Sequence, residues 1–594
     1  MVLRWIEVRL RGETFDGVWF SVTGIGGWVV VVIRSKAILP LTSMTDKKEH
    51  NIGVTIDSSD QSSNHSHDEK IKTVISVTAE DMAHRDAVIT TILSPDGKEV
   101  DITGDVDDAM RLALKSKGVV LTPELNAKLL RKTDLMLFPI MCMIYSVQFM
   151  DKVTTSNASI MGLVTDLKMH GQQYSYVGSA FYFGYLGGLF ILPPIMQKTK
   201  KFMKLLTTII IIWGMVLALH AAPSVNYPSF IFLRCLLGFL ESAITPAFTI
   251  ITSQYWRKEE QFSRINFWFG FNGLGTIWGG SIAYGLFTHQ NSYSIEAWKL
   301  VFIITGCITI FMGFIMMLHL PDSPDKAWFF SEEEKLLLVE RIRDNQQGFG
   351  NHHFKKHQFL EALKDIRTWL YFFFSVASNI PNGGVTNFSS ILLKSDFRYS
   401  TSKSLLVNMG SGAVELVGCP LFGLLSFWCF QRKFKVLSSR LVWAFIATAI
   451  CFIGVCMLAF AKHDKHARLA GFMLIGIAPV SFICVLSCIS SNTLGYTKKW
   501  TVSSINLLAY AGANIAGPHT FIDTQAPDYN GAKVSLVVCY AAALVIIVMI
   551  YIINVRENKR RDKIEAERVN EPVIENIEFA DLTDFENLKF RYAI

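Results

Sequence analysis

Five charged side chains stand inside stretches that are otherwise long and apolar enough to cross a lipid bilayer. They are Asp151, Lys152, Arg234, Glu241 and Glu415. A charge near the bilayer centre costs at least about 2.5 kcal/mol and marks a functional site by default. The chemistry open to such groups is the binding of an oppositely charged ligand and the uptake and release of protons.

Arg234 and Glu241 belong to one such stretch, RCLLGFLESAITPAF, and are seven residues apart. They therefore share a helix face about 10 Å apart along its axis. An arginine stays protonated and offers a planar fork to a carboxylate, so Arg234 is a candidate anion holder. Desolvation raises a carboxyl pKa and a nearby cation lowers it. A Glu241 that loses its cation to a bound anion would take up a proton.

A structural role is the alternative for each charge. An Arg–Glu or Lys–Asp pair can simply lock two helices together. Glu415, in GSGAVELVGCP, has no partner at helical spacing, so it is either a second titrating group or pairs with another helix. Asn379 and Asn382 flank Pro381, which predicts a broken helix beside a cavity, where freed backbone can meet a ligand. Asn514 stands in a similar small-residue segment.

The composition predicts the elements that must position these residues. Of 594 residues, 51% are hydrophobic and 18% charged, whereas soluble domains carry about 25% charged residues. The basic residues behind the net charge of +7 lie in short loops, which argues against nucleic-acid binding. The ten cysteines form no CxxC pair and read as small buried residues. No phosphate-binding loop, zinc spacing or nucleophile triad is present, so we expect neither an enzyme nor a metal site.

The apolar residues form twelve blocks of about 20 residues, the length of a membrane-spanning helix. The blocks are about 135–156, 174–196, 205–222, 229–254, 264–288, 298–320, 368–393, 404–428, 438–460, 467–493, 501–522 and 534–555. Six blocks, a long connector and six more predict an all-α membrane protein built from two six-helix pseudo-repeats. FGFNGLGTIWGG and AYAGANIAGP, in the fifth and eleventh blocks, support the repeat because both are rich in small residues.

The chain divides into six regions by this reading. They are a doubtful N-terminal extension (1–43), a polar cytoplasmic region (44–130), the first bundle (131–320), a cytoplasmic central loop with short helices (321–366), the second bundle (367–556) and a cytoplasmic tail (557–594). Lys and Arg in the short loops of the first half place both termini in the cytoplasm. Val18–Ile33 could be a thirteenth membrane span, but it is short for one. The other interpretations of this segment are a signal peptide and upstream sequence translated in error. SEEEKLLLVERIRDN predicts a short helix with a capping box.

Several stretches together resemble the major facilitator superfamily, and within it the fungal allantoate permease branch of the anion:cation symporters. The stretches are FMDKVT, RCLLGFLESAITPAF, LPDSPDKAWFFSEEE, GYTKKWTVSSINLLAYAGANIAGP and FADLTDFENLKFRY, within residues 125–594. The nearest members are permeases for allantoate-like ureido acids and for cysteine. The resemblance implies a secondary transporter in the plasma membrane that imports a small organic anion together with protons. It implies no cofactor beyond the proton gradient.

The resemblance also assigns roles. Asp151 and Glu241 match residues associated with proton coupling, and Lys152 and Arg234 match residues associated with anion binding. Many relatives have Arg in place of Lys152, and some have a further Arg where this chain has Asn379 and Asn382. We expect the four charges to face one central cavity, with Glu415 as a further proton carrier and Asn514 as a further binding residue. A monomer is expected; a uniporter without coupling and a non-transporting nutrient sensor are the competing functions.

Overall fold

The computed structural model describes residues 18–25, 28–35, 91–93, 99–101, 122–199, 201–342, 355–432, 434, 436–567 and 583–594. The chain forms two compact units, residues 1–87 and residues 88–594. In the first unit, β1 (Val18–Ile25) pairs with β2 (Trp28–Ser35) in an antiparallel hairpin. The described residues of this segment are thus strands, and the alternative of a thirteenth helical span does not hold for them. The segment is rich in β-branched and aromatic residues, with two glycines between the halves, a composition that favours a hairpin.

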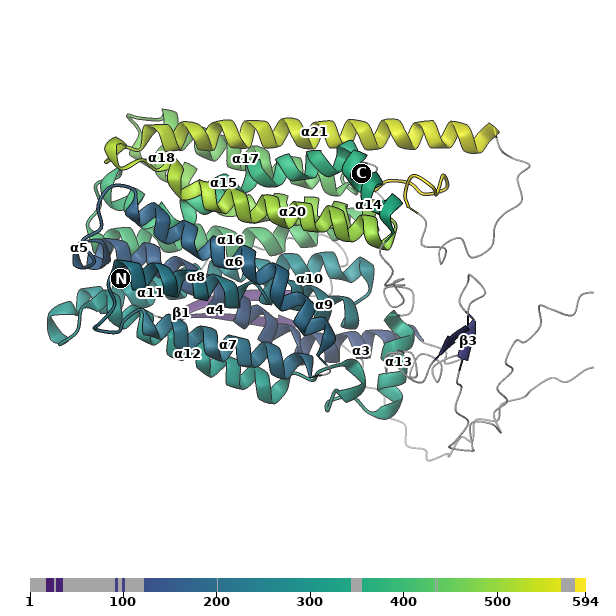
Figure 1. The fold of residues 1–594 in the computed structure, drawn as a ribbon, viewed down its shortest axis with the longest axis horizontal. Coiled ribbons are helices and arrows are strands. Elements are labelled where there is room, and N and C mark those ends of the chain that lie inside the picture. Colours follow the sequence, from purple (N-terminus) through teal and green to yellow (C-terminus); the bar gives the residue numbers. More distant parts are fainter. Residues whose placement is uncertain are drawn as a thin grey trace, which may run out of the picture. The chain divides into compact units, whose positions relative to one another are not determined.

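Each of the twelve predicted blocks is helical, and Figure 1 shows the helices running side by side. The first six are α4 (Phe138–Ala158), α6 (Gln173–Lys198), α7 (Phe202–Leu219), α8 (Tyr227–Glu241) with α9 (Ile244–Tyr255), α10 (Lys258–Gly270) with α11 (Asn272–Thr288), and α12 (Ala297–His319). The second six are α15 (Ile366–Ser395), α16 (Thr401–Gln431), α17 (Arg440–Phe460), α18 (Lys465–Leu474) with α19 (Ala478–Asn492), α20 (Tyr496–Ala516), and α21 (Asn530–Glu567).

Shorter elements complete the second unit. They are β3 (Thr91–Leu93) paired with β4 (Glu99–Asp101), α3 (Pro123–Met136), η1 (Ser159–Leu163), α5 (Val164–Asp166), η2 (Gln290–Ser292), η3 (Pro324–Lys326), α13 (Glu332–Ile342), α14 (Lys356–Lys364), η5 (Ile475–Ile477), η6 (Gly517–Thr520) and η7 (Asp523–Gln525). Within the described residues, nine helices are long and apolar enough to cross a membrane by length and composition. The helices outside this set include α11, α15 and α20, which carry several of the asparagines and glycines of the interior.

The two halves repeat the same packing. In the first half α11 packs on α4 and α12 on α7; in the second half α20 packs on α15 and α21 on α17. Small residues permit the equivalent contacts. A Cβ on Gly275 would lie 2.2 Å from the Ser146 carbonyl oxygen, and one on Gly517 would lie 2.5 Å from the Ile380 carbonyl oxygen. The internal repeat that the sequence predicts is thus reflected in the helix pairs.

The stretch RCLLGFLESAITPAF lies on α8 and the start of α9, and α8 packs closely on α6. A Cβ on Gly238 would lie 1.8 Å from the Phe181 carbonyl oxygen, and one on Gly184 would lie 1.7 Å from the Cys235 carbonyl oxygen. Neither position can hold a larger residue without separating the helices. This close crossing fixes the rotation of α8, and with it the direction of Arg234.

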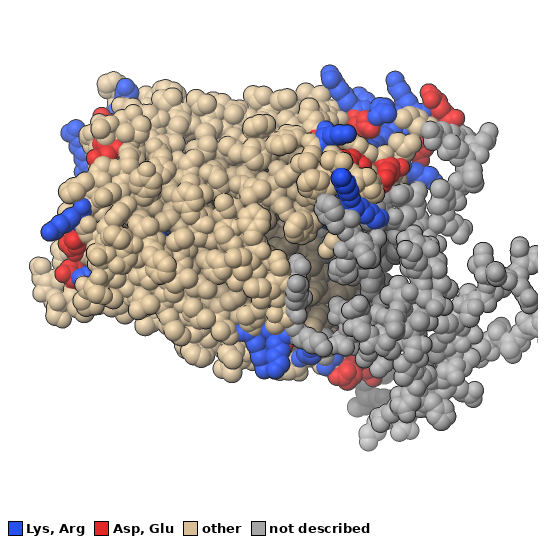
Figure 2. Space-filling model, viewed as in Figure 1, with Lys and Arg blue, Asp and Glu red and all other residues tan. Residues whose placement is uncertain are grey.

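Charged side chains gather at the two ends of the bundle, and the band between them is almost free of charge at the surface (Figure 2). We call these ends the α5 end and the α14 end, after the helices that lie there (Figure 1). Figure 2 also shows the surface hollowed between the two halves toward the α14 end. The uncharged band is the part of the surface that suits the hydrocarbon core of a membrane.

Hydrogen bonds between the halves gather at the α5 end. Three of them run from hydroxyls of α6 to backbone carbonyls of the second half: Tyr174 to Asn387 (2.8 Å), Ser175 to Pro518 (3.1 Å) and Ser179 to Ile515 (2.7 Å). Ser390 Oγ also donates to Asn157 Oδ1 (2.9 Å). The hydrogen bonds between the halves therefore lie at the α5 end, whereas at the α14 end the hollow lies between them and α10 still packs against α16.

The α14 end contains the predicted capping box and a buried ionic network. Ser331 N donates to Glu334 (3.1 Å) and Glu334 N donates to Ser331 Oγ (3.2 Å), as expected for the start of α13. In the network, Lys498 Nζ lies 2.9 Å from Glu361, 3.2 Å from Asp365 and 2.7 Å from Asp584. Asp584 comes from the last described segment, residues 583–594, which is thereby attached to α14, α15 and α20.

Candidate functional site in a cavity between the halves

A cavity of about 180 Å³ lies between the two halves. Polar side chains line it from both sides. They include Gln148, Lys152, Tyr182, Tyr185, Asn272 and Thr276 from the first half, and Ser378, Asn379, Asn382, Asn408, Ser411, Glu415 and Tyr510 from the second. A largely apolar pocket with a few convergent polar groups is the default position for a small-molecule site.

Lys152 and Glu415 are the charged residues among the described side chains that line this cavity. Lys152 comes from α4, and its Nζ lies 5.5 Å from the centre of the Phe181 ring. Glu415 comes from α16 and is 6% exposed. Its Oε1 atom is buried without a hydrogen-bond partner, and Asn272 of α11 lies beside it. Each half thus contributes one charge, and the two are of opposite sign.

Arg234 lies next to the cavity rather than in it. It lines a second, small cavity of about 10 Å³, and Lys152 lines both. The guanidinium packs over the rings of Phe230 and Phe302, each 5.7 Å from the ring centre. Its Nε and Nη2 atoms are buried and have no hydrogen-bond partner. Lys152, Tyr182 and Thr386 line both cavities and therefore lie between Arg234 and the central cavity.

Asp151 and Glu241 are fully buried behind the cavity wall. Asp151 Oδ2 accepts a hydrogen bond from Thr309 on α12 (2.9 Å), and Oδ1 has no partner. Both carboxylate oxygens of Glu241 are without a hydrogen-bond partner. The charges that act on Glu241 are those of Lys152 and Arg234, and the Gln148 amide acts on it as a weak hydrogen-bond donor. The expectation that all four charges face one cavity is thus wrong for Asp151, Arg234 and Glu241.

None of the five interior charges forms a salt bridge with another described residue. The alternative of a closed Arg–Glu or Lys–Asp pair that locks two helices is therefore not what the structure has. A buried charge without a partner is costly, and such groups are candidates for binding and proton transfer.

The three asparagines are divided between the cavity and its support. Asn379 and Asn382 line the cavity on α15. Asn514 is fully buried on α20 and lies outside the cavity lining; its Oδ1 accepts from Asn382 Nδ2 (2.9 Å), so it orients Asn382. The predicted helix break at Pro381 is wrong, because α15 continues through it. A proline removes one helical hydrogen bond, and the packing of α15 against α20 holds the helix together there.

The helical hydrogen bonding is interrupted elsewhere, directly after Glu241. α8 ends at Glu241 and α9 begins at Ile244, while Ser242 and Ala243 keep right-handed helical dihedrals. Pro246 explains the interruption, because it lacks the N–H that would bond the Ser242 carbonyl. This interruption was not predicted from the sequence, although Pro246 is a visible signal for it. The carboxyl group of Glu241 therefore stands at a weak point of its helix.

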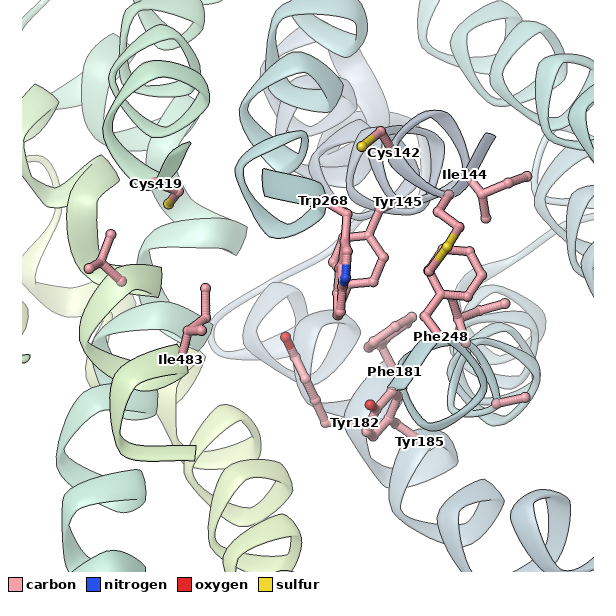
Figure 3. Close-up of a cluster of buried hydrophobic side chains, with 14 of the residues drawn as sticks. Cys142, Ile144, Tyr145, Phe181, Tyr182, Tyr185, Phe248, Trp268, Cys419 and Ile483 are labelled. Carbon is pink, nitrogen blue, oxygen red and sulfur yellow. The ribbon is translucent and has the colours of Figure 1, made fainter. Parts of the chain in front are cut away.

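Aromatic rings close the side of the cavity between α6 and α20. Tyr510 of the second half lies 6.2 Å from Tyr182 and 5.9 Å from Tyr185 of the first, measured between ring centres. Figure 3 shows the Tyr182 hydroxyl directed into the space between the two halves, with Tyr145 and Trp268 side by side above it in this view. The two halves are therefore in contact through these aromatic rings on this side of the cavity, and not through a salt bridge between Lys152 and Glu415.

Comparison with known proteins identifies the architecture. The sequence matches the Major Facilitator Superfamily over residues 141–518. The chain belongs to this superfamily. A solved structure of the xylose transporter XylE from E. coli, in a partially occluded inward open conformation, shares the fold with a TM-score of 0.51 and 12% identity over 70% of this chain and 97% of that chain.

Two curated relatives refine the position of this facilitator within the superfamily. The allantoate permease of Saccharomyces cerevisiae is 59% identical over 510 residues, which cover 85% of this chain and 94% of the relative. The thiamine pathway transporter of the same yeast is 32% identical over 513 residues, which cover 85% and 93%. The facilitator is thus an integral membrane transporter of a small molecule, on the fungal allantoate permease branch, and not an enzyme.

Proposed function

We propose that this facilitator imports a small organic anion together with protons. The observation that carries the proposal is the arrangement of Lys152 and Arg234. Both cations lie at or beside the cavity, and neither has a carboxylate partner within salt-bridge distance among the described residues. An anion that enters the cavity would meet Lys152 first. The similarity to an allantoate permease makes a ureido acid the first candidate.

Competition for Lys152 would couple the anion to the proton. Glu241 forms no salt bridge among the described residues, and Lys152 is the charge that acts on it most strongly. When a substrate carboxylate pairs with Lys152, the support for a charged Glu241 weakens, and proton uptake by Glu241 becomes favourable. Release of the anion would return Lys152 to Glu241 and favour loss of the proton. Asp151, which accepts from Thr309, would be the neighbouring proton carrier.

In the proposed membrane orientation, the α14 end and both termini lie in the cytoplasm. We propose that the membrane is the plasma membrane and that the protein is a monomer. With that orientation, the bonds at the α5 end close the outer side, and the hollow faces inward. Rocking of the two halves about the cavity would then open the cavity to one side of the membrane and to the other in turn. Opening outward requires the hydroxyl-to-carbonyl bonds of α6 to break.

Uptake in cells that lack their own allantoate transporter tests the function. Labelled allantoate should accumulate more at outside pH 5 than at pH 7.5, and a protonophore should abolish the accumulation. Glu241→Gln should lose accumulation but keep exchange of internal for external allantoate. The matched control is Glu296→Gln, a carboxylate that is paired with Lys299 at the α5 end.

Each competing function has its own outcome. Accumulation that is unchanged in Glu241→Gln would refute the coupling role of this residue. Uptake without pH dependence or accumulation would indicate a uniporter. Binding of allantoate to the purified protein without any flux would indicate a sensor.

A further inference from the structure

The central cavity has opposite charges on its two sides. Lys152 lines it from the first half and Glu415 from the second, and no salt bridge joins them. A site for a simple anion needs only the cation. The carboxylate would repel a ligand that is negative throughout, so its presence restricts what the cavity can accept.

Glu415 has the properties of a binding group rather than a structural one. Its side chain is more than nine-tenths buried, it lines the cavity, and Oε1 has no hydrogen-bond partner. Its cavity-lining neighbours on α16 are otherwise engaged. Asn408 Nδ2 donates to Ser390 (3.5 Å), and Ser411 Oγ donates to the Asn408 carbonyl (2.8 Å). The side chain of Asn272, on α11, does act on the Glu415 carboxylate as a hydrogen-bond donor, and Oε1 is the oxygen that remains without a partner.

The backbone around Glu415 holds its helix in place. A Cβ on Gly476 of the neighbouring segment would lie 2.6 Å from the Ser411 carbonyl oxygen and 3.5 Å from Glu415 N. Such close packing leaves α16 little freedom to rotate Glu415 away from the cavity. The acceptor is thus positioned before a ligand arrives.

We propose that Glu415 accepts hydrogen bonds from N–H groups of the substrate, and that it selects anions with an amide, ureido or ammonium end. This inference rests on the proposed function, in which Lys152 binds the carboxylate end. A carboxylate can accept two parallel N–H bonds from one planar group, as it does from a guanidinium. Since a ureido group presents such a pair, the cavity would hold a ureido acid by both ends, one end on each half.

Two isosteric competitors test the inference against labelled allantoate uptake. N-carbamoylglycine carries a carboxylate and a ureido group; levulinate has the same shape and carboxylate, but carbon replaces both nitrogens. The natural protein should bind N-carbamoylglycine at least about tenfold more tightly, because a site built to hydrogen-bond a donor rejects the analogue that lacks it. Glu415→Gln should lose most of this preference and bind levulinate within about twofold of the natural affinity.

Glu415→Asp is the second variant, which keeps the charged acceptor and should keep part of the preference. Equal affinity of the natural protein for both competitors, or no inhibition by either, would overturn the inference. Glu415→Gln that weakens both ligands equally, or shifts the pH dependence of both, would also overturn it and favour a proton-carrying role. In each case proton-driven allantoate uptake that depends on Lys152 would leave the proposed function intact.

Discussion

Two sets of buried charges in this transporter differ in whether they have partners. At the α14 end, Lys498 is 1% exposed and lies within 3.2 Å of three carboxylates. Arg561, 2% exposed, donates to three backbone carbonyls and to the Tyr592 hydroxyl in the last segment. In the middle of the bundle, Arg234 and Glu241 are equally buried, and neither has an ion-pair partner among the described residues.

Under the proposed function, the paired charges hold the fold and the charges without ion-pair partners bind the anion and carry the proton. A buried ion that is fully paired has its desolvation cost offset by its neighbours, and removal of one member leaves the others exposed to that cost. A buried ion without a partner destabilises the fold. It is retained where binding or proton transfer needs it. Burial alone does not distinguish the two sets, but partners do.

Lys498→Met should give the largest loss of stability, because it leaves Asp365 and Asp584 buried without their shared cation. We expect a destabilisation of roughly 3–5 kcal/mol, seen as a lower unfolding temperature of the detergent-purified protein. Arg560→Met is the matched control, since Arg560 is 66% exposed in its pair with Glu557. An equal loss in both variants would contradict the distinction.

Lys152→Met should show the opposite pattern. Allantoate binding should weaken at least about 100-fold, or about 2.8 kcal/mol, because the cavity loses its lining cation. The unfolding temperature should stay the same or rise, because Lys152 forms no salt bridge among the described residues and Glu241 can take up a proton when the cation is lost. Binding should be measured on the purified variant alongside its unfolding curve. A large fall in stability would show that Lys152 is structural.

Tyr592→Phe should have an intermediate effect. The Tyr592 hydroxyl donates to Asp584 (2.7 Å) and accepts from Arg561 (2.9 Å), and the ring is 2% exposed. Removing the hydroxyl leaves buried groups unsatisfied, at a cost of about 1–3 kcal/mol. Tyr293→Phe, where the residue is 39% exposed, serves as the control in the same unfolding assay. Identical unfolding temperatures would place the last segment outside the cooperative fold.

The smallest effect concerns Glu334, at the start of α13. Burial raises the pKa of its carboxyl group, but the Lys132 ammonium and the Ser331 N–H outweigh burial and hold the pKa below its ordinary value. The resulting stabilisation is complete above the unfolded pKa of about 4.3 and is lost as pH falls through the lower folded pKa. Glu334→Gln should therefore cost less than about 1 kcal/mol at pH 7 and nothing below pH 3. A constant difference across this range would exclude the carboxylate as the cause.

The sequence predicts the fold well because apolar block length and small-residue packing are local properties. It predicts the interior charges for the same reason. The direction of each side chain depends on helix packing, which is not local. Asp151 and Lys152 are adjacent, yet consecutive residues project about 100° apart around a helix. Lys152 therefore reaches the cavity while Asp151 faces Thr309 on α12.

The paired network at the α14 end could not be predicted from the sequence. Glu361, Lys498 and Asp584 come from three segments separated by more than 80 residues each, and only folding brings them together. Glu415, by contrast, was visible as a lone acid in an apolar block. Its position in the cavity wall could not be predicted, because that position depends on the packing of α16 against α11.

The hydrogen bonds that join the halves along α6 depend mainly on side chains of α6. Tyr174, Ser175 and Ser179 donate to backbone carbonyls of the second half. Ser179 Oγ also lies 3.1 Å from Nε2 of His519, a side chain of the second half. Side-chain replacement in the second half cannot delete a backbone acceptor. The strength of the three bonds to carbonyls can therefore be tuned, by evolution or by design, through three hydroxyl groups on a single helix, without altering the half that carries Glu415.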